Sequence, residues 1–408
     1  MFTFLTAGES HGRSLTAVIE NFPAGVGITA ADVNRDLERR QMGYGRGDRM
    51  KIESDSCEIL SGVRGGRTLG SPISFIIRNN DWVNWEQVMN PGENDPARVA
   101  EKRVTNPRPG HADLAGALKY GHTTDVRNVL ERASARETTA RVGVGAFARA
   151  LLKHFDISVC SHVIALGEAE APGWSPESGI DPAEISELAD RSEVRCLDSQ
   201  AEKKIIERID RAKDEKDTLG GVFEVVVAGL PPGLGSYTHW DRRLDARLVR
   251  ALVSIPAVKG AEVGPAFKNA RRPGSQVHDE IFRRDSGDEP VSGRPYHVGP
   301  YYRKTNRAGG IEGGMSNGEP IILRAAKKPI PTVMKPLWTV DLSTGEPVQA
   351  CTERSDVCAL PAASVIGDAV IAIEIARAFL ESFGGSNLLD IEANYRHYVK
   401  RVSLSHEH

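Results

Sequence analysis

The sequence has no hydrophobic run long enough to cross a membrane. Its best candidate, residues 364–383, carries Asp368, Glu374, Arg377 and Glu381, so we expect a buried amphipathic helix there. The N-terminus lacks a basic segment followed by a long apolar one, and no signal peptide is expected. The formal net charge of −3 gives no excess of positive charge, so neither a nucleic acid nor a membrane is expected as a partner.

Cysteine is scarce. The five cysteines are an odd number, and no two have the C-x-x-C spacing, which argues against a disulfide framework or a structural zinc site. We therefore expect no metal site and a reducing, cytoplasmic location. The sequence also lacks the G-x-x-x-x-G-K-[ST] phosphate loop. The glycine-rich run 306–320 has no strand–turn–helix context that would make it a dinucleotide fingerprint.

Segments typical of strands and of helices alternate along the chain without a fixed repeat, which indicates an α/β or α+β sandwich. The patterns predict strands over 14–22, 71–79, 158–167, 222–230 and 320–326. They predict helices over 29–41 (with Thr29 as N-cap), 125–155 and 199–217, and 364–383 as the last helix. No linker is obvious, and residues 177–193 are expected to form a variable surface segment.

Basic residues gather among glycines at three places, the first of which follows the helix 29–41. Arg39 and Arg40 end this helix, where positive charge interacts favourably with the helix dipole, and that alone would explain them. Arg46 and Arg49 lie in the glycine-rich loop beyond it. They lack that explanation and suit phosphate or carboxylate ligands, although a solvated loop is the alternative.

The second basic cluster surrounds His111. Pro107 and Pro109 flank Arg108 and stiffen the chain before a helix begins. A histidine fixed on such a turn is suited to proton transfer near neutral pH, and Arg108 and Asp113 accompany it. A lone histidine is more often structural, so both interpretations stay open.

The third basic cluster is the segment RASARETTAR. Arg132 and Arg136 are four residues apart, which would place them on one face of a helix. The small residues between them would let a flat ligand approach. Glu137 could pair with Arg141, so the alternative is an ordinary helix surface with salt bridges.

The N-terminal motif GESHG, residues 8–12, fits the G-x-S-x-G pattern of serine hydrolases, with Ser10 as the nucleophile. A nucleophile elbow follows a central strand, however, and only residues 1–7 precede this motif. A non-enzymatic module that binds anions or nucleic acid through the arginine-rich loops is a further alternative. It would be expected to carry a basic overall charge, which this chain lacks.

Seven motifs together resemble the chorismate synthase family and occur in that family's order: GESHG, GRGDRM, RPGHAD, KYG, RASARET, NRAGGIEGGMSNG and RSDVCALPA. The run 337–348 also resembles the family's hairpin. The resemblance implies one α+β domain over 1–408, with helices between two antiparallel sheets, assembled as a homotetramer. It implies a lyase of the shikimate pathway that eliminates phosphate from 5-enolpyruvylshikimate 3-phosphate. Such an enzyme requires reduced FMN, although the reaction has no net redox change.

The resemblance further implies roles for individual residues. His11 would protonate the departing phosphate, His111 would stabilise reduced flavin near N1, and Asp356 would assist deprotonation at flavin N5. Residues expected to bind substrate are Ser10, Arg40, Arg46, Arg49, Arg108 and Arg136. Residues expected to bind cofactor are Arg40, Arg46, Arg132, Ala133, Ser134, Pro256, Ala257, Gly313, Lys328, Pro329, Ile330, Pro331, Thr332 and Arg354. Arg40 and Arg46 also match positions associated with NADP. NADPH is therefore expected as an indirect reductant, acting through an external flavin reductase.

Overall fold

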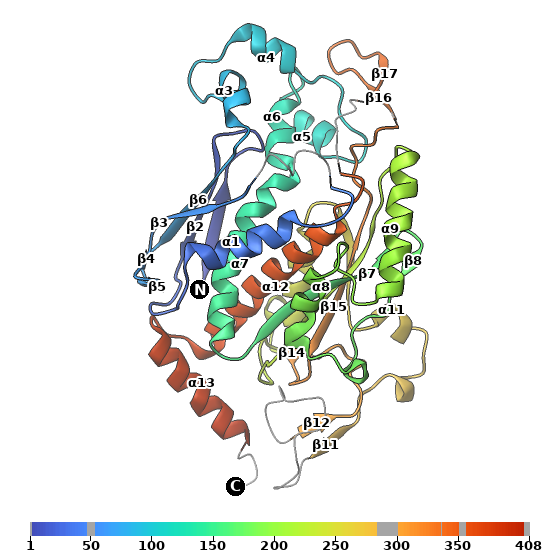
Figure 1. The fold of residues 1–408 in the computed structure, drawn as a ribbon. Helices are drawn as coiled ribbons and strands as arrows, with labels where there is room; N and C mark the ends of the chain where they lie inside the picture. Colours follow the sequence, from blue (N-terminus) through green and yellow to red (C-terminus); the bar gives the residue numbers. More distant parts are fainter. Residues whose placement is uncertain (1, 47–53, 284–300, 336, 351–355, 404–408) are drawn as a thin grey trace.

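Two antiparallel sheets enclose a central layer of helices (Figure 1). The structure is a computed structural model. It describes the chain except residues 1, 47–53, 284–300, 336, 351–355 and 404–408. In the described part of the chain, no helix is both long and apolar enough to span a membrane. The predicted α+β sandwich with helices between two antiparallel sheets is confirmed.

The two sheets contain all five predicted strands. The first has the order β1-β2-β6-β3 and is formed by β1 (Thr3–Ala7), β2 (Ser14–Glu20), β3 (Cys57–Ser61) and β6 (Ile73–Arg78). The second has the order β10-β15-β9-β7-β8 and is formed by β7 (Ser158–Leu166), β8 (Ala169–Glu170), β9 (Gly221–Ala228), β10 (Val258–Val263) and β15 (Ile321–Lys327).

The central layer consists of α1 (Ala30–Gln41), α7 (Thr138–Lys153) and α12 (Leu360–Phe383). α7 and α12 approach closely because α7 has a glycine where they meet: a Cβ on Gly145 would lie 2.5 Å from the Cβ of Ala369. α12 is buried along nearly its whole length, as the sequence predicts. α1 begins with the expected capping box, in which Thr29 and Asp32 bond each other's backbone N–H groups.

The prediction of one continuous helix over 125–155 is wrong. The chain forms α6 (Arg127–Ala133), a 3₁₀ turn (Ala135–Glu137) and then α7. Ser134 separates them because its backbone is extended, with φ −64° and ψ 143°, and its side chain accepts a hydrogen bond from the N–H of Arg136. Arg132 and Arg136 therefore do not share a helix face.

Two further expectations fail. The segment 177–193 is not a surface excursion, because its α8 (Ile185–Asp190) packs on β7 and buries Ile185 and Ala189. The helix α12 is not the last one, because α13 (Leu388–Ser403) follows it.

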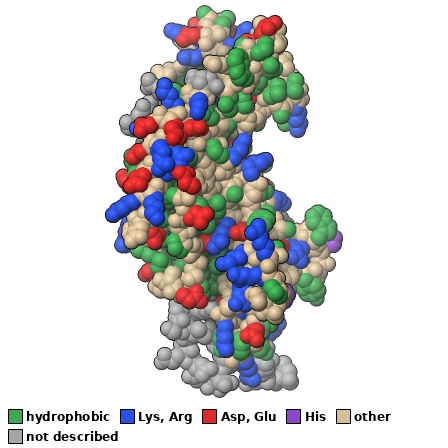
Figure 2. Space-filling model, turned by 90° about the vertical axis from the view of Figure 1, so that its right-hand side faces the viewer, with side chains coloured by type: hydrophobic (Ala, Val, Ile, Leu, Met, Phe, Trp, Pro, Cys, Tyr) green, Lys and Arg blue, Asp and Glu red, His purple; other side chains and the backbone are tan. Residues whose placement is uncertain are grey.

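The other described elements lie around the sandwich. The upper end in Figure 1 carries α3 (Trp82–Met89), α4 (Pro96–Lys102), α5 (Asp113–Tyr120), α6 and the expected hairpin of β16 (Trp338–Val340) and β17 (Pro347–Gln349). Elsewhere lie α9 (Ser199–Asp214), α10 (Leu244–Val253), α11 (Ala266–Asn269), β4 (Val63–Arg64), β5 (Arg67–Thr68), β11 (Ile281–Arg283), β12 (Tyr301–Arg303), β13 (Ile311–Glu312), β14 (Met315–Ser316) and 3₁₀ turns at Pro176–Ser178, Pro182–Glu184, Trp240–Arg242 and Gly274–Gln276. On the face shown in Figure 2, Lys and Arg side chains gather along the hollow below the upper end.

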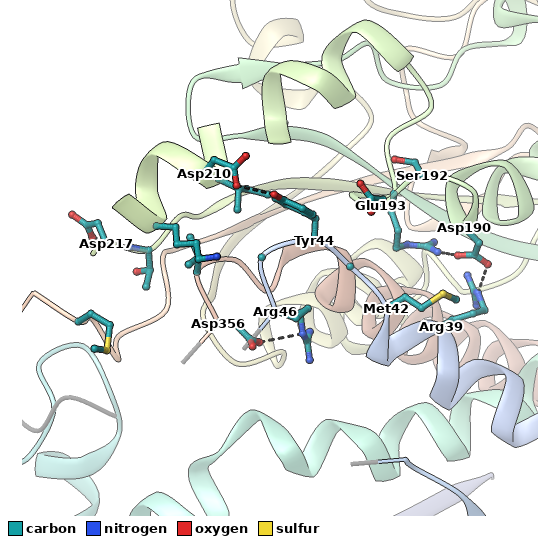
Figure 3. Close-up of a pocket in the computed structure, with 18 of the residues that line it drawn as sticks. Arg39, Met42, Tyr44, Arg46, Asp190, Ser192, Glu193, Asp210, Asp217 and Asp356 are labelled. Carbon is teal, nitrogen blue, oxygen red and sulfur yellow. Dashed lines mark hydrogen bonds and ion pairs between the residues drawn. The ribbon is translucent and has the colours of Figure 1, made fainter. Parts of the chain in front are cut away.

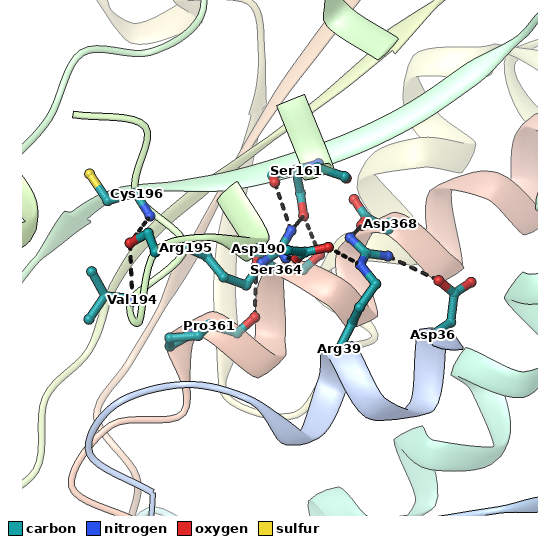
Figure 4. Close-up of polar contacts among 12 residues, drawn as sticks. Asp36, Arg39, Ser161, Asp190, Val194, Arg195, Cys196, Pro361, Ser364 and Asp368 are labelled. Atoms are coloured by element: carbon teal, nitrogen blue, oxygen red, sulfur yellow. Dashed lines mark hydrogen bonds and ion pairs between the residues drawn. The ribbon is translucent and has the colours of Figure 1, made fainter. Parts of the chain in front are cut away.

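A buried ion cluster joins α1, α7, α8 and α12. It consists of three arginines and three aspartates: Arg39, Arg149, Arg195, Asp36, Asp190 and Asp368. Arg39 lies at its centre (Figure 4) and contacts all three aspartates, with N–O distances of 2.7–3.0 Å. Its three positive charges balance its three negative charges, so we interpret the cluster as a structural salt-bridge network that connects the helices.

Candidate active site

The GESHG motif lies in the turn between β1 and β2, so no helix follows it as a nucleophile elbow requires. Ser10 is 2% exposed, and its Oγ accepts a hydrogen bond from the Oγ of Ser134 at 3.2 Å. The neighbouring His11 binds a glutamate instead of Ser10. Because the motif lies in a turn between two strands and not between a strand and a helix, it is no nucleophile elbow, and the serine hydrolase alternative is wrong.

His11 is held by Glu131, at the end of α6. The ring Nδ1 lies 2.8 Å from Oε1 and 3.0 Å from Oε2 of the glutamate, and the backbone N–H of His11 donates to Oε2 at 2.8 Å. The ring stacks on Trp85 of α3, with centroids 4.0 Å apart and planes 27° apart. The sequence analysis missed both Glu131 and Trp85, which are 120 and 74 residues away from His11 (131 − 11 and 85 − 11).

His111 has a similar environment at the start of α5. Its Nδ1 lies 2.5 Å from Oδ1 of Asp113, and Arg108 Nε donates to Oδ2 of the same carboxylate at 2.8 Å. Burial opposes ionisation of Asp113, but the hydrogen bonds from His111 and Arg108 outweigh it and hold the pKa of Asp113 well below its usual range. An ionised carboxylate only accepts, so Nδ1 carries the proton. The 3.2 Å approach of Arg108 Nη2 to Nδ1 is then no hydrogen bond.

The predicted substrate arginines Arg40 and Arg136 meet at Asp55, a buried residue that the sequence analysis missed. Arg136 Nη1 lies 2.5 Å from Oδ1 of Asp55, and Arg40 Nη1 lies 3.8 Å from Oδ2. Burial lowers the pKa of Arg40 to about 10. Asp55 offsets this effect only in part, and the charges of Arg46 and Arg136 add to it.

Arg46 and Asp356 form an ion pair at 3.2 Å on the wall of a cavity of about 860 Å³ (Figure 3). The cavity lies between the loop after α1, the segment after α8 and the end of α9. Neither His11 nor His111 is among the residues that line it. The charges of this pair also act on Arg40, whose pKa Arg46 lowers and Asp356 raises.

Asn79, which follows β6, connects the arginine group to the N-terminal turn. Its Oδ1 accepts from Arg136 Nε at 3.0 Å, and its Nδ2 donates to the backbone oxygen of Gly12 at 2.5 Å. The sequence analysis did not single it out, because an asparagine at a strand end carries no distinctive signal. The result is that Ser10, His11, Arg40 and Arg136 form one connected group.

The predicted flavin segment 328–332 lies against the His111 turn. Lys328 Nζ donates to the backbone oxygen of Gly110 at 2.5 Å, and Arg108 Nη1 donates to Thr332 Oγ1 at 3.2 Å. The N–H of Lys328 donates to the oxygen of Ala257 at 2.9 Å. Ala257 has a φ of +68°, which is a strained backbone for a residue with a Cβ and is typical of functional sites.

The contacts of two other predicted cofactor residues, Gly313 and Arg132, are with different parts of the chain. Gly313 lies in the turn of the β13–β14 hairpin, and no described contact joins it to the other predicted residues; its neighbour Gly314 contacts Arg243 and Leu244 at the start of α10. Arg132 is exposed and donates to the backbone oxygens of Thr6 and Gly8. The predicted Arg49 and Arg354 lie outside the described residues.

Comparisons with known proteins identify the family. The family model described as chorismate synthase matches residues 2–380. The chain belongs to the chorismate synthase family. A protein of that name from Pelobacter propionicus is 57% identical over 406 residues, which cover 98% of this chain and 99% of that protein. Another from Alkaliphilus metalliredigens is 57% identical over 399 residues, covering 98% and 100%.

A solved structure is also similar. A crystal structure of chorismate synthase has a TM-score of 0.77 and 39% sequence identity, covering 98% of each chain. The family assignment made from the sequence motifs is thereby confirmed. Members of the family are carbon–oxygen lyases of the shikimate pathway, which serves aromatic amino acid biosynthesis. They convert 5-enolpyruvylshikimate 3-phosphate to chorismate and phosphate.

Proposed function

We propose that this chain carries out the chorismate synthase reaction at the connected group of Ser10, His11, Arg40 and Arg136, together with Arg46, Asp356 and the His111 turn, with reduced FMN as its cofactor. The observation that supports this most strongly is the convergence of positive charge at that group. In the described part of the chain, Arg40, Arg46 and Arg136 gather around the carboxylates of Asp55 and Asp356. The substrate carries one phosphate and two carboxylates, which guanidinium groups gathered in this way would bind.

The arginines would bind and orient the substrate. Guanidinium groups suit this role because each offers several fixed N–H donors to a phosphate or carboxylate. Arg40 and Arg136 are already held by Thr138, Asn79 and Asp55, so little conformational freedom remains to be lost when the anion binds. Arg108 and Arg49 complete the set by the family pattern.

The histidines would move protons at Nε2. Both Nδ1 atoms lie against carboxylates, and no described residue forms a hydrogen bond with either Nε2. His11, protonated on both ring nitrogens, would give its Nε2 proton to the departing phosphate as the carbon–oxygen bond breaks and the electron pair stays on oxygen. The ring would then be left in its neutral Nδ1–H form beside Glu131. Asp356, beside Arg46, would assist deprotonation at flavin N5. Ser10 would contribute a hydrogen bond only.

The residues around His111 fit the flavin. Arg108 and Lys328 bring two positive charges against one carboxylate, Asp113, which suits an anionic cofactor. When bound, reduced FMN would supply electron density that helps to expel the phosphate, and it would regain that density by the end of the reaction. His111 would stabilise the flavin near N1 through its Nε2. NADPH would serve as an indirect reductant through an external reductase.

We further propose one catalytic domain over 1–408 that acts in the cytoplasm as a homotetramer. The decisive experiment is anaerobic turnover of 5-enolpyruvylshikimate 3-phosphate, followed by phosphate release. We expect release with dithionite-reduced FMN, and none with oxidised FMN or without flavin. Equal release in all three reactions would contradict the flavin requirement, while the size of the assembled protein can be measured separately by light scattering.

A further inference from the structure

The carboxylate of Glu131 is almost completely withdrawn from solvent, with 1% of its side chain exposed, and all its close donors are known. Oε1 receives Arg127 Nη1 at 3.0 Å and the His11 ring at 2.8 Å, and Oε2 receives the backbone N–H of His11. Burial alone would raise the pKa of Glu131, but the hydrogen bonds from His11 and the charge of Arg127 outweigh it, so this pKa is lowered. An ionised carboxylate cannot donate, so the Nδ1 of His11 must hold the hydrogen.

The plane of the His11 ring is fixed as well. Trp85 stacks on it, and the indole N–H of Trp85 donates to Asp81 Oδ2 at 2.9 Å, which holds the indole in place. Arg127 lies over the same indole, with its Cζ 4.9 Å from the ring centroid, and Lys102 lies 5.8 Å away. The imidazole is therefore restrained by a carboxylate at one edge and by an aromatic ring at one face.

We propose that Glu131 is a positioning residue that fixes the Nδ1–H tautomer of His11 and so reserves Nε2 for proton exchange with the departing phosphate. The inference rests on the proposed function, because it takes His11 as the proton donor. Glu131 itself would touch neither substrate nor flavin. Without its carboxylate, the neutral ring could adopt the other tautomer or rotate. Nε2 would then no longer be placed to take up a proton and, from the doubly protonated ring, to pass it to the phosphate.

A second histidine–glutamate pair in the same chain provides a matched control. His162 Nε2 lies 3.1 Å from Oε1 of Glu224, and Arg324 binds the other carboxylate oxygen at 2.8 Å. This pair is buried in the five-stranded sheet and includes none of the predicted site residues. The variant Glu224→Gln therefore removes the same kind of charge from a similar histidine–arginine environment outside the candidate active site.

The kinetic test uses the holoenzyme with reduced FMN and measures single-turnover phosphate release. We expect His11→Ala to slow release on the order of 10²–10⁴-fold. Glu131→Gln should slow it by about 10- to 100-fold, as expected for a partner that orients a functional histidine, with little change in KM. Glu131→Asp should restore part of the rate, and Glu224→Gln should keep the wild-type rate.

The double variant His11→Ala/Glu131→Gln separates positioning from general structural damage. If Glu131 acts through His11, the double variant is no slower than His11→Ala alone. If the loss in rate of the double variant equals the product of the two single losses, the inference is overturned, because Glu131 would then act independently of His11. A wild-type rate in Glu131→Gln would overturn it as well.

The tautomer can be measured without turnover, by NMR of isotope-labelled histidine side chains, with the His11 signal assigned by its loss in His11→Ala. We expect the Nδ1–H form in the wild type, and a mixture of tautomers in Glu131→Gln. An unchanged tautomer in that variant overturns the inference. If His11→Ala retains full activity, the proposed role of His11 fails on its own, while the NMR result still decides whether Glu131 sets the tautomer.

Discussion

Two neighbouring arginines on α1 have opposite electrostatic environments. Arg39 lies in the buried ion cluster, where burial alone would lower its pKa but the carboxylates of Asp368 and Asp36 outweigh burial and raise it. Arg40 points to Asp55 instead, and burial lowers its pKa to about 10. Three arginines meet three aspartates around Arg39, whereas three arginines meet two aspartates around Arg40 in the part of the chain that the structure describes.

The comparison distinguishes a structural cation from a ligand-binding one. A buried charge can be tolerated in the fold when opposite charges neutralise it. Removing one of these partners leaves the remaining charge buried and unpaired, which destabilises the fold strongly. A buried charge with incomplete neutralisation is costly in the free protein and becomes favourable when an anion arrives. A lowered pKa does not by itself mark a ligand-binding arginine, because burial and the charge of Arg39 lower the pKa of Arg195, within the ion cluster, to about 9. The neighbouring charges separate the two, since Arg195 pairs with Asp190 inside the cluster, whereas Arg40 lies beside Asp55 and Arg136.

The largest expected effect is on stability, in Arg39→Met. This change leaves Asp36, Asp190 and Asp368 with only Arg149 and Arg195, and breaking a buried pair in this way costs about 3–5 kcal/mol of unfolding free energy. We expect a clear loss in denaturant midpoint, with the activity per folded molecule largely kept. Equal stability of variant and wild type would show that the cluster does not hold the helices together.

The next largest effect is on catalysis, in Arg40→Met. Loss of one charge-assisted contact of about 1.5–3 kcal/mol should lower kcat/KM by roughly 10- to 150-fold. Stability should fall less than in Arg39→Met, because Asp55 keeps its contact with Arg136. Arg39→Met should therefore lose more stability, and Arg40→Met should lose more activity. If one variant shows the larger loss in both measurements, the distinction between the two arginines is contradicted.

Acid should weaken the fold through the site carboxylates. The pKa of Asp113 and that of Glu131 are both depressed in the folded protein. Their contribution to stability is therefore complete above the usual carboxyl pKa of about 4 and is lost as pH falls through the lower folded values. Asp113→Asn should flatten the fall of unfolding free energy below about pH 4. A curve parallel to that of the wild type would contradict this.

The smallest effect is expected at Arg35, a third arginine of α1. It pairs with Asp32 at 3.3 Å, but its side chain is 68% exposed. Such surface pairs contribute about 0–1 kcal/mol, so Arg35→Ala should change neither the melting temperature nor the turnover appreciably. A loss comparable to that of Arg39→Met would show that burial and charge balance do not separate the arginines of this helix.

The local sequence determined much of this molecule. Alternation of apolar residues indicated the strands, and Thr29 with Asp32 indicated the start of α1, because these signals depend on neighbours in the chain. Seven motifs in order identified the family. Within the site, the residues themselves singled out His111 beside Arg108 on a turn stiffened by prolines, whereas His11, Arg40 and Arg136 were assigned roles through the family motifs.

Only the tertiary structure decided which of these residues act together. Arg39 and Arg40 are adjacent, and their local context is the same, yet their partners come from different helices and loops far away in the sequence. Likewise Glu131 precedes a recognisable motif, but its role depends on a turn 120 residues earlier. Charge balance and hydrogen bonding at a buried site are sums over groups that only folding brings together, so no local pattern could have contained them.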